Sequence, residues 1–487
     1  MRRWTARRAP VMSLLALCCL LVSVGCSTVA KGSGSPQRVQ LAPDASAASL
    51  PIIGDGHTRF DQLVRNALTD VEQFWNQAYP TLSGGSPLKP LAGGVYSVET
   101  NRPNLANACM KAQPKAANNN AFYCRLDDSF AYDRIGLVKI ITDKLGANFV
   151  PLVFAHEFGH LIQNRLDKSD HASIYLESQA DCASGAFMAA ESGVGTVTLR
   201  NIHFGISPTN LDALTVGMIL LRDYSPHSSA DSGTHGDGFD RISAFSDGFS
   251  NGVKYCYSND WYNRRFTERA YTSDTDYLSG GNESLAKVLD PAPATATGGG
   301  GGGLQPSLND FWTRAFTTIK RTFKPVTIKQ ADHPPCGPNG SQFNYCASDN
   351  TVYYSKDFAT SAYYSVPVLV QDPTTKIVSI QQNSAADYAL GAMFAYGWGL
   401  AVRSQLGLST STAAGLLGAS CYVGAYSKTI NVDTAKGFEL SPPDMDEATV
   451  AVLRIVGQNS ALGDRNTTGF QRISAFKKGY FGSLTAC

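Results

Sequence analysis

The stretch of sequence that decides the fold is Phe149-Val-Pro-Leu-Val-Phe-Ala-His-Glu-Phe-Gly-His-Leu-Ile-Gln163. Its apolar residues predict a largely buried helix that starts near Pro151, because proline is tolerated in the first turn of a helix. His156 and His160 are four positions apart and therefore lie one turn apart on the same helix face. Two imidazoles placed in this way can bind a single metal ion.

The spacing His-Glu-x-x-His, here residues 156–160, is typical of zinc hydrolases. Glu157 directly follows the first histidine, where it can act as the general base that takes a proton from water beside the metal. A hydrolytic zinc site normally has three protein ligands and leaves a fourth position to water. The alternative is a pair of core or surface histidines that bind nothing.

A third ligand is expected close to this helix. The position six residues beyond the second histidine is Leu166, and His171 lies in a polar stretch that predicts a loop. Glu177 is the better candidate, because residues 175–187 predict a second apolar-periodic helix. Asp181 follows Glu177 by one turn on the same face, where it can orient a ligand histidine through a hydrogen bond. The alternatives are a solvated surface Glu177 and a helix-capping or solvated Asp181.

Four separated segments resemble the bacterial "putative neutral zinc metallopeptidases", and within them the exported lipoprotein metallopeptidases. These segments are Phe122–Cys124, Ala155–His160 with Gln163, Glu177–Cys182, and His235-Gly236 ahead of Arg241. The resemblance covers roughly residues 60–256.

The resemblance implies a zincin-like fold in which two helices supply His156, His160 and Glu177 as zinc ligands. It implies that Glu157 is the catalytic base and that His235 donates a hydrogen bond to the developing oxyanion. The alternative for His235 is an exposed histidine in a Gly/Ser-rich loop.

The sequence also repeats part of itself on either side of a Pro-, Ala- and Gly-rich linker, residues 290–306. Four blocks recur in the same order and predict a duplication. The matched blocks are residues 74–79 and 311–316, 122–124 and 344–346, 154–160 and 394–400, and 238–245 and 469–476.

The second copy lacks the chemical groups of the first. Tyr396, Gly397 and Leu400 stand opposite His156, Glu157 and His160, while Leu416, Ser420 and Asn466 stand opposite Glu177, Asp181 and His235. The second copy also has about eighteen additional residues between Cys346 and its degenerate motif. We therefore expect it to bind no catalytic zinc, and either to stabilise the first copy or to hold a substrate or an envelope protein partner.

The 11 cysteines follow the same division. Cys18 and Cys19 lie in an apolar N-terminal run, Cys26 follows that run, and four cysteines remain in each copy. Each set of four allows three pairings, and we favour those in which the first pair closes a short polar loop. The favoured pairs are Cys109–Cys124, Cys182–Cys256, Cys336–Cys346 and Cys421–Cys487. The alternative, cysteine-bound zinc, lacks a Cys-x-x-Cys pair.

Residues 1–25 predict a secretory signal peptide, because four arginines precede an apolar run of 15 residues, too short to span a bilayer comfortably. Gly25-Cys26 resembles a lipobox in which Cys26 is acylated; the alternative is an ordinary cleaved signal. Residues 26–55 are rich in Ser, Ala, Gly and Pro and predict a flexible tether. We therefore expect a lipid-anchored protein on the extracytoplasmic face of the cell membrane.

The 487-residue chain carries 41 Lys+Arg and 40 Asp+Glu, a balance that argues against nucleic-acid binding. The predicted fold class is α+β and mainly helical, with a zincin-like domain at residues 56–289 and a degenerate copy at residues 307–487. The predicted function is zinc-dependent hydrolysis of a peptide or protein substrate. The alternative is a non-catalytic envelope scaffold or binding lipoprotein with a vestigial or structural zinc site.

Overall fold

The computed structural model describes most of the chain after residue 45. The described residues are 46–99, 105–223, 234–267, 271, 273–292, 302–337, 340–371, 378–432, 438, 440–454 and 467–487. The predicted signal peptide, Cys26, most of the tether, the middle of the linker and Asn466 lie outside them. Below, residues 46–292 are called the first half and residues 302–487 the second half.

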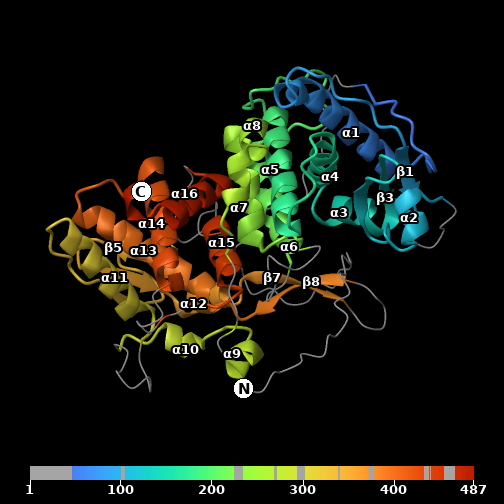
Figure 1. Cartoon of the computed structure of the whole chain (residues 1–487). Coiled ribbons are helices and arrows are strands. Elements are labelled where there is room, and N and C mark those ends of the chain that lie inside the picture. Colours follow the sequence, from blue (N-terminus) through green and yellow to red (C-terminus); the bar gives the residue numbers. More distant parts are fainter. Residues whose placement is uncertain are drawn as a thin grey trace, which may run out of the picture.

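The described chain is mainly helical, which confirms the predicted α+β, mainly helical class, and it contains three small sheets (Figure 1). The first half contains α1 (Arg59–Ala78), β1 (Gly94–Val98), α2 (Ala108–Ala112), β2 (Ala121–Cys124), β3 (Ser129–Asp133), α3 (Lys139–Lys144), α4 (Phe149–Arg165), α5 (Ser173–Glu191), α6 (Pro208–Leu220), α7 (Gly238–Asn251), α8 (Val253–Cys256), α9 (Asp274–Leu278) and α10 (Leu285–Val288). The second half contains α11 (Leu304–Thr318), β4 (Thr327–Gln330), β5 (Phe343–Cys346), β6 (Thr351–Tyr354), α12 (Lys356–Tyr363), β7 (Val366–Gln371), β8 (Val378–Ser384), α13 (Asp387–Gln405), α14 (Ala413–Val432), α15 (Asp444–Arg454) and α16 (Gly469–Gly482).

The two helices predicted around the His-Glu-x-x-His pattern are confirmed as α4 and α5. Pro151 lies in the first turn of α4, and the polar stretch with His171 is the loop between the two helices. None of the helices that the structure describes combines the length and apolar character needed to cross a bilayer.

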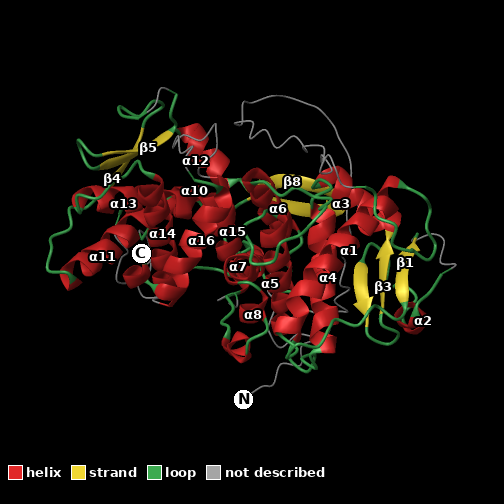
Figure 2. Cartoon of the chain, turned by 90° about the horizontal axis from the view of Figure 1, so that it is seen from above, coloured by secondary structure: helices red, strands yellow, loops and turns green. Residues whose placement is uncertain are grey.

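Each half carries a three-stranded sheet with the same topology. β3 is central, parallel to β1 and antiparallel to β2; β6 is central, parallel to β4 and antiparallel to β5. The two sheets lie at opposite ends of the molecule and the helices fill the space between them (Figure 2). One continuous hydrophobic core runs through both halves, from Phe60 to Tyr480.

The main helix pairs of the two halves pack through glycines. A Cβ at Gly185 would overlap the carbonyl oxygen of Phe245, and one at Gly248 would overlap that of Cys182, so α5 and α7 touch through their backbones. Gly424 and Gly479 make the same kind of contact between α14 and α16. A disulfide bond joins α5 to α8, the helix that follows α7, and another joins α14 to Cys487, which follows α16.

The eight cysteines pair as favoured from the sequence. The Cα–Cα distances are 5.8 Å for Cys109–Cys124, 5.7 Å for Cys182–Cys256, 5.7 Å for Cys336–Cys346 and 5.6 Å for Cys421–Cys487. Two of these bonds close the short loops before β2 and β5, and the other two join α5 to the short helix α8 and α14 to Cys487.

Two predicted boundaries are wrong. The tether is predicted to extend to residue 55, but residues 46–55 pack on the rest of the first half. The N–H of Ile53 donates to the carbonyl of Val95 in β1 at 2.8 Å, and the N–H of Ser97 donates to the carbonyl of Ile53 at 2.9 Å. Arg65 also donates to the carbonyl of Leu50 at 2.8 Å. The linker was expected to extend to residue 306, but α11 begins at Leu304, because that side chain is buried in the core.

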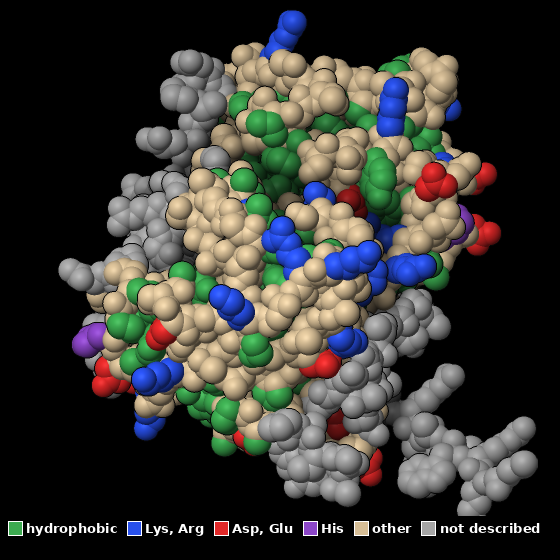
Figure 3. Space-filling view, turned by 90° about the vertical axis from the view of Figure 1, so that its left-hand side faces the viewer, with side chains coloured by type: hydrophobic (Ala, Val, Ile, Leu, Met, Phe, Trp, Pro, Cys, Tyr) green, Lys and Arg blue, Asp and Glu red, His purple; other side chains and the backbone are tan. Residues whose placement is uncertain are grey.

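The additional residues of the second half form the hairpin β7–β8, which extends toward α6 of the first half (Figures 1 and 2). On the face of the second half that Figure 3 shows, hydrophobic side chains are scattered among polar ones. Lys and Arg side chains gather across the middle of that face.

Replacing Gly248 by alanine is expected to lower the free energy of unfolding by about 1–3 kcal/mol, because the new Cβ would push α5 and α7 apart. At an unhindered helix position the same change stabilises by up to about 1 kcal/mol. Gly205→Ala is the control, since Gly205 is exposed with open space around it, and should change stability by less than about 0.5 kcal/mol. Urea unfolding measures both, and equal effects would contradict the close helix contact.

Candidate metal centre

The site is built where α4 crosses α5. A Cβ at Gly159 would come within 2.8 Å of the Cα of Ala180, so only glycine lets the two helices approach this closely. Gly159 lies between the two histidines of the motif, and Ala180 lies between Glu177 and Asp181. The close crossing therefore brings the polar groups of both helices together.

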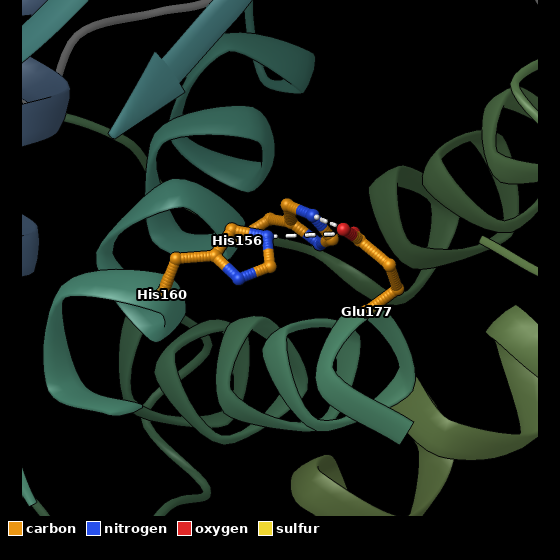
Figure 4. A group of neighbouring side chains, drawn as sticks. All are labelled: His156, His160 and Glu177. Atoms are coloured by element: carbon orange, nitrogen blue, oxygen red, sulfur yellow. Dashed lines mark hydrogen bonds and ion pairs between the residues drawn. The ribbon is translucent and has the colours of Figure 1, made fainter. Parts of the chain in front are cut away.

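The structure brings His156, His160 and Glu177 into one group (Figure 4). The Nε2 atoms of His156 and His160 lie 3.1 and 3.4 Å from the same oxygen, Oε2 of Glu177. Ligand atoms of a tetrahedral zinc ion, bound at about 2.0–2.1 Å, are separated by roughly 3.4 Å. The spacing of the three donors therefore fits a zinc ion.

The opposite ring atoms of both histidines are already bonded to acceptors. Nδ1 of His156 lies 2.8 Å from Asp181, and Nδ1 of His160 lies 2.9 Å from Oε1 of Gln163. Gln163 in turn donates to the carbonyl of Leu176 on α5, at 2.7 Å. Because these partners require Nδ1–H, the Nε2 lone pairs of the neutral rings point at a carboxylate, and a cation between them would satisfy all three atoms.

Asp181 lies where the sequence predicted, next to a histidine of the motif, and it is also held by an arginine. Arg241 on α7 donates to both of its carboxylate oxygens, at 2.9 and 3.0 Å. A third bond, 2.7 Å long, joins Arg241 to the carbonyl of Leu221 at the end of α6. Burial opposes ionisation of Asp181, but Arg241 and His156 outweigh it and lower its pKa to about 2. Asp181 is therefore a fixed anion behind the first histidine.

The charges around the site also shift the pKa values of His156 and Glu177. Burial disfavours the charged form of His156, yet Asp181 and Glu177 prevail and raise its pKa to about 10 when no cation is bound. Burial also disfavours charge on Glu177, but His160 and His235 lower its pKa well below the ordinary value. Glu177 therefore stays ionised, and a metal ion must displace a proton from the imidazole that faces it.

Glu157 lies beside the group but is not part of it. Its Oε2 accepts a hydrogen bond of 3.1 Å from the backbone N–H of Tyr123 in β2. Burial raises the pKa of Glu157, although the neighbouring histidines act in the opposite direction. A carboxylate that is anchored at one oxygen and has a raised pKa is suited to take up and return a proton.

His235 reaches the same site from the segment before α7. Its Nε2 lies 3.7 Å from Glu177 and its Nδ1 lies 3.4 Å from Asp223. Asp223 also accepts from the backbone N–H groups of His235 and Gly236, at 2.5 and 3.1 Å. The imidazole is 29% exposed, so it borders the site where solvent can enter. His171, in contrast, stacks on Tyr262 with ring centroids 3.6 Å apart.

Sequence reasoning missed three features of the site. It did not assign Gln163 to His160, pair Arg241 with Asp181, or place Asp223 behind His235. Gln163 is a local signal, three residues after His160 on the same helix. Asp181 and Arg241 are 60 residues apart, and Asp223 and His235 are 12 residues apart and not on one helix, so no spacing rule relates either pair.

The family model described as "Putative neutral zinc metallopeptidase" matches residues 9–258, which is just over half of the chain. The chain belongs to this metallopeptidase family. The family supports zinc as the metal and hydrolysis as the reaction. Its match ends two residues after Cys256 and does not include the second half. No match was found among curated proteins or among solved structures.

Asp181→Asn is expected to weaken zinc binding by about 10–100-fold, because the histidine loses a charged orienting partner. Asp170→Asn is the matched control: Asp170 is an exposed carboxylate in the loop between α4 and α5, and its loss should leave the affinity unchanged. Competition with a chromogenic chelator measures both affinities. Equal affinities in the two variants would show that Asp181 does not orient a ligand.

Zinc binding at pH 7 is expected to release at least one proton, since the metal-free pKa of His156 is raised to about 10. The apparent zinc affinity should therefore rise with pH between 6 and 9. Titration calorimetry in buffers of different ionisation enthalpy counts the protons released. A count of zero at pH 7 would contradict the raised pKa.

Proposed function

We propose that the first half is a zinc-dependent peptidase that cleaves peptide bonds outside the cytoplasmic membrane. The convergence of His156, His160 and Glu177 on one point, with Glu157 beside it, carries this proposal. Three protein donors leave a coordination position open, as hydrolytic zinc sites do, whereas structural sites are usually closed by four side chains. The side chains of the three donors are 10–22% exposed, so the group opens toward solvent on one side.

Zinc bound here would lower the pKa of a water molecule and polarise the scissile carbonyl. Glu157 takes the proton of the attacking water on its free carboxylate oxygen, while the other oxygen stays bonded to the N–H of Tyr123. Its raised pKa favours the protonated form that then donates to the leaving amine. His235 donates a hydrogen bond to the developing oxyanion, oriented by Asp223 on its Nδ1 side.

The proposed location rests on the disulfide bonds and on the N-terminal sequence. All eight cysteines among the described residues are paired, a pattern expected of proteins that fold in an oxidising compartment. We place the protein on the extracytoplasmic face of the cell membrane, anchored by acylated Cys26. Its substrate is a peptide or protein of that compartment.

The second half is proposed to be a degenerate copy of the first. The shared topology of the two small sheets and the equivalent glycine contacts of α5–α7 and α14–α16 support a duplication. Tyr396 and Leu400, on α13, are buried in the apolar core, and Ser420 on α14 donates to the carbonyl of Leu416. These positions offer no metal ligands, so the copy serves structure or partner binding, including an envelope protein partner.

Glu157→Gln is expected to keep zinc but to lower the rate of peptide hydrolysis by on the order of 10²–10⁴-fold, because the amide cannot accept the proton. Glu72→Gln on α1 removes the same charge outside the metal group and should behave like the wild type. The measurements are zinc content per chain and chelator-sensitive cleavage of an unfolded protein. Full turnover by Glu157→Gln would exclude Glu157 as the base. One bound zinc without cleavage by the wild type would favour the scaffold function.

A further inference from the structure

The two halves meet through a nearly symmetric interface, in which α6 and α7 of the first half face α15 and α16 of the second. In Figure 1, α15 and α16 lie directly beside α7. The helices α7 and α16 contain the repeated block Gly-Phe-x-Arg-Ile-Ser-Ala-Phe, at residues 238–245 and 469–476. The first aromatic residue of each block meets the second aromatic residue of the other block across the interface.

The aromatic contacts are reciprocal. Phe239, the first aromatic of the block in α7, packs edge-on against Phe476, the second aromatic in α16, with ring centroids 5.3 Å apart. Phe245, the second in α7, packs in the same way on Phe470, the first in α16, at 5.9 Å. In a two-fold dimer, each contact between two positions occurs twice, once in each direction. The interface between the two halves shows this pattern.

The helix N-termini are capped reciprocally as well. Asp446 on α15 accepts a bond of 3.0 Å from the backbone N–H of Phe239 in the first turn of α7. Asp212 on α6 accepts bonds of 2.8 and 2.7 Å from the N–H groups of Gly469 and Phe470, in the first turn of α16. Each half thus supplies a carboxylate to the positive end of a helix in the other half.

The second oxygen of Asp446 forms a buried ion pair of 2.7 Å with Arg222. Arg222 precedes Asp223, the residue that holds the backbone and side chain of His235. Asp446 therefore bonds to Arg222 and to the backbone of Phe239, and each of these lies close in sequence to one of the residues that place His235, namely Asp223 and Gly236.

Helix α7 also connects this cap to the metal centre. Arg241 lies two residues after Phe239, and its guanidinium clamps both oxygens of Asp181 and the carbonyl of Leu221. Asp181 in turn holds Nδ1 of His156. A shift of the first turn of α7 would move the arginine that orients the first ligand.

We propose that the second half acts as a built-in positioning subunit for the metal centre, through Asp446. This carboxylate fixes the N-terminus of α7 and Arg222, and thereby fixes Arg241 and His235 at the site. The inference rests on the proposed zinc site in the first half. Asp446 touches neither metal nor substrate, so it is a positioning residue and not a catalytic one.

The symmetry of the interface supplies a matched control. Asp446→Ala and Asp212→Ala each remove one carboxylate cap from the same interface, but α16, the helix capped by Asp212, carries no residue of the metal centre. In the full-length chain, Asp446→Ala is expected to weaken zinc affinity about tenfold, and Asp212→Ala by less than about twofold. Chelator competition measures the affinities, and hydrogen exchange measures backbone protection at residues 235–241 and 469–472.

Asp446→Ala should lose exchange protection at residues 235–241, and Asp212→Ala at residues 469–472. Asp446→Asn keeps an acceptor for the N–H of Phe239 but loses the charge that faces Arg222, so its zinc affinity should lie between those of the wild type and Asp446→Ala. If the alanine variant does not fold, an unchanged zinc affinity in Asp446→Asn would overturn the proposal. Equal loss of zinc affinity in the Asp446 and Asp212 variants would overturn the proposal, as would an unchanged affinity in Asp446→Ala. A wild-type protein that binds zinc but cleaves no peptide would refute the peptidase function alone, because this experiment reads zinc affinity.

Discussion

The close crossing of α4 and α5 is the constraint on which the site depends. At Gly159 the helices approach until a Cβ would lie 2.8 Å from the Cα of Ala180. At that separation the carboxylate of Glu177 reaches the histidines of α4, and Asp181 reaches the far side of one imidazole. If the two helices crossed at a greater distance, Glu177 and Asp181 would not reach the histidines. Both helices would then bury polar groups without partners, which costs free energy. The glycine inside the histidine motif therefore sets the geometry that the motif needs.

Local sequence rules predicted the helices, the metal group and the short cysteine loops, because each depends on spacing within one or two adjacent elements. The two long cysteine pairs, 74 and 66 residues apart, followed from elimination once the short loops were assigned. The four-residue spacing of His156 and His160 specifies a shared helix face whatever surrounds it. The pairs Arg241–Asp181 and Asp446–Phe239 join residues that are distant in sequence, and only the packing of α7 on α5 and α15 brings them together. The tether boundary failed for a related reason: residues 46–55 have a linker-like composition but find backbone partners in β1.

Under the proposed duplication, the features that both halves share are those on which packing depends. The glycines between the long helices, the disulfide bonds and the sheet topology all recur. Replacing one of these glycines would lower the free energy of unfolding, because the new side chain overlaps backbone atoms and a rotamer change cannot remove the overlap. The polar groups of the metal centre carry no such packing role, and the second half has no histidine or carboxylate in their place.

This difference bears on why the first half retains the buried carboxylate of Asp181. Replacing a buried ion pair such as Asp181–Arg241 by apolar side chains is often neutral or stabilising, because desolvation of the two charges offsets their attraction. In the second half, the residues aligned with His156 and Asp181 are the fully buried Tyr396 and Ser420, which donates to the carbonyl of Leu416. Stability alone would therefore favour the arrangement of the second half. Asp181 orients the imidazole of His156, and Arg241 keeps Asp181 ionised. The second half keeps the arginine of this pair as the buried Arg472, which donates to the carbonyls of Val452 and Leu453, but has Ser420 in place of the aspartate. The buried Asp181 carboxylate of the first half is therefore explained by the histidine that it orients and not by a gain in stability.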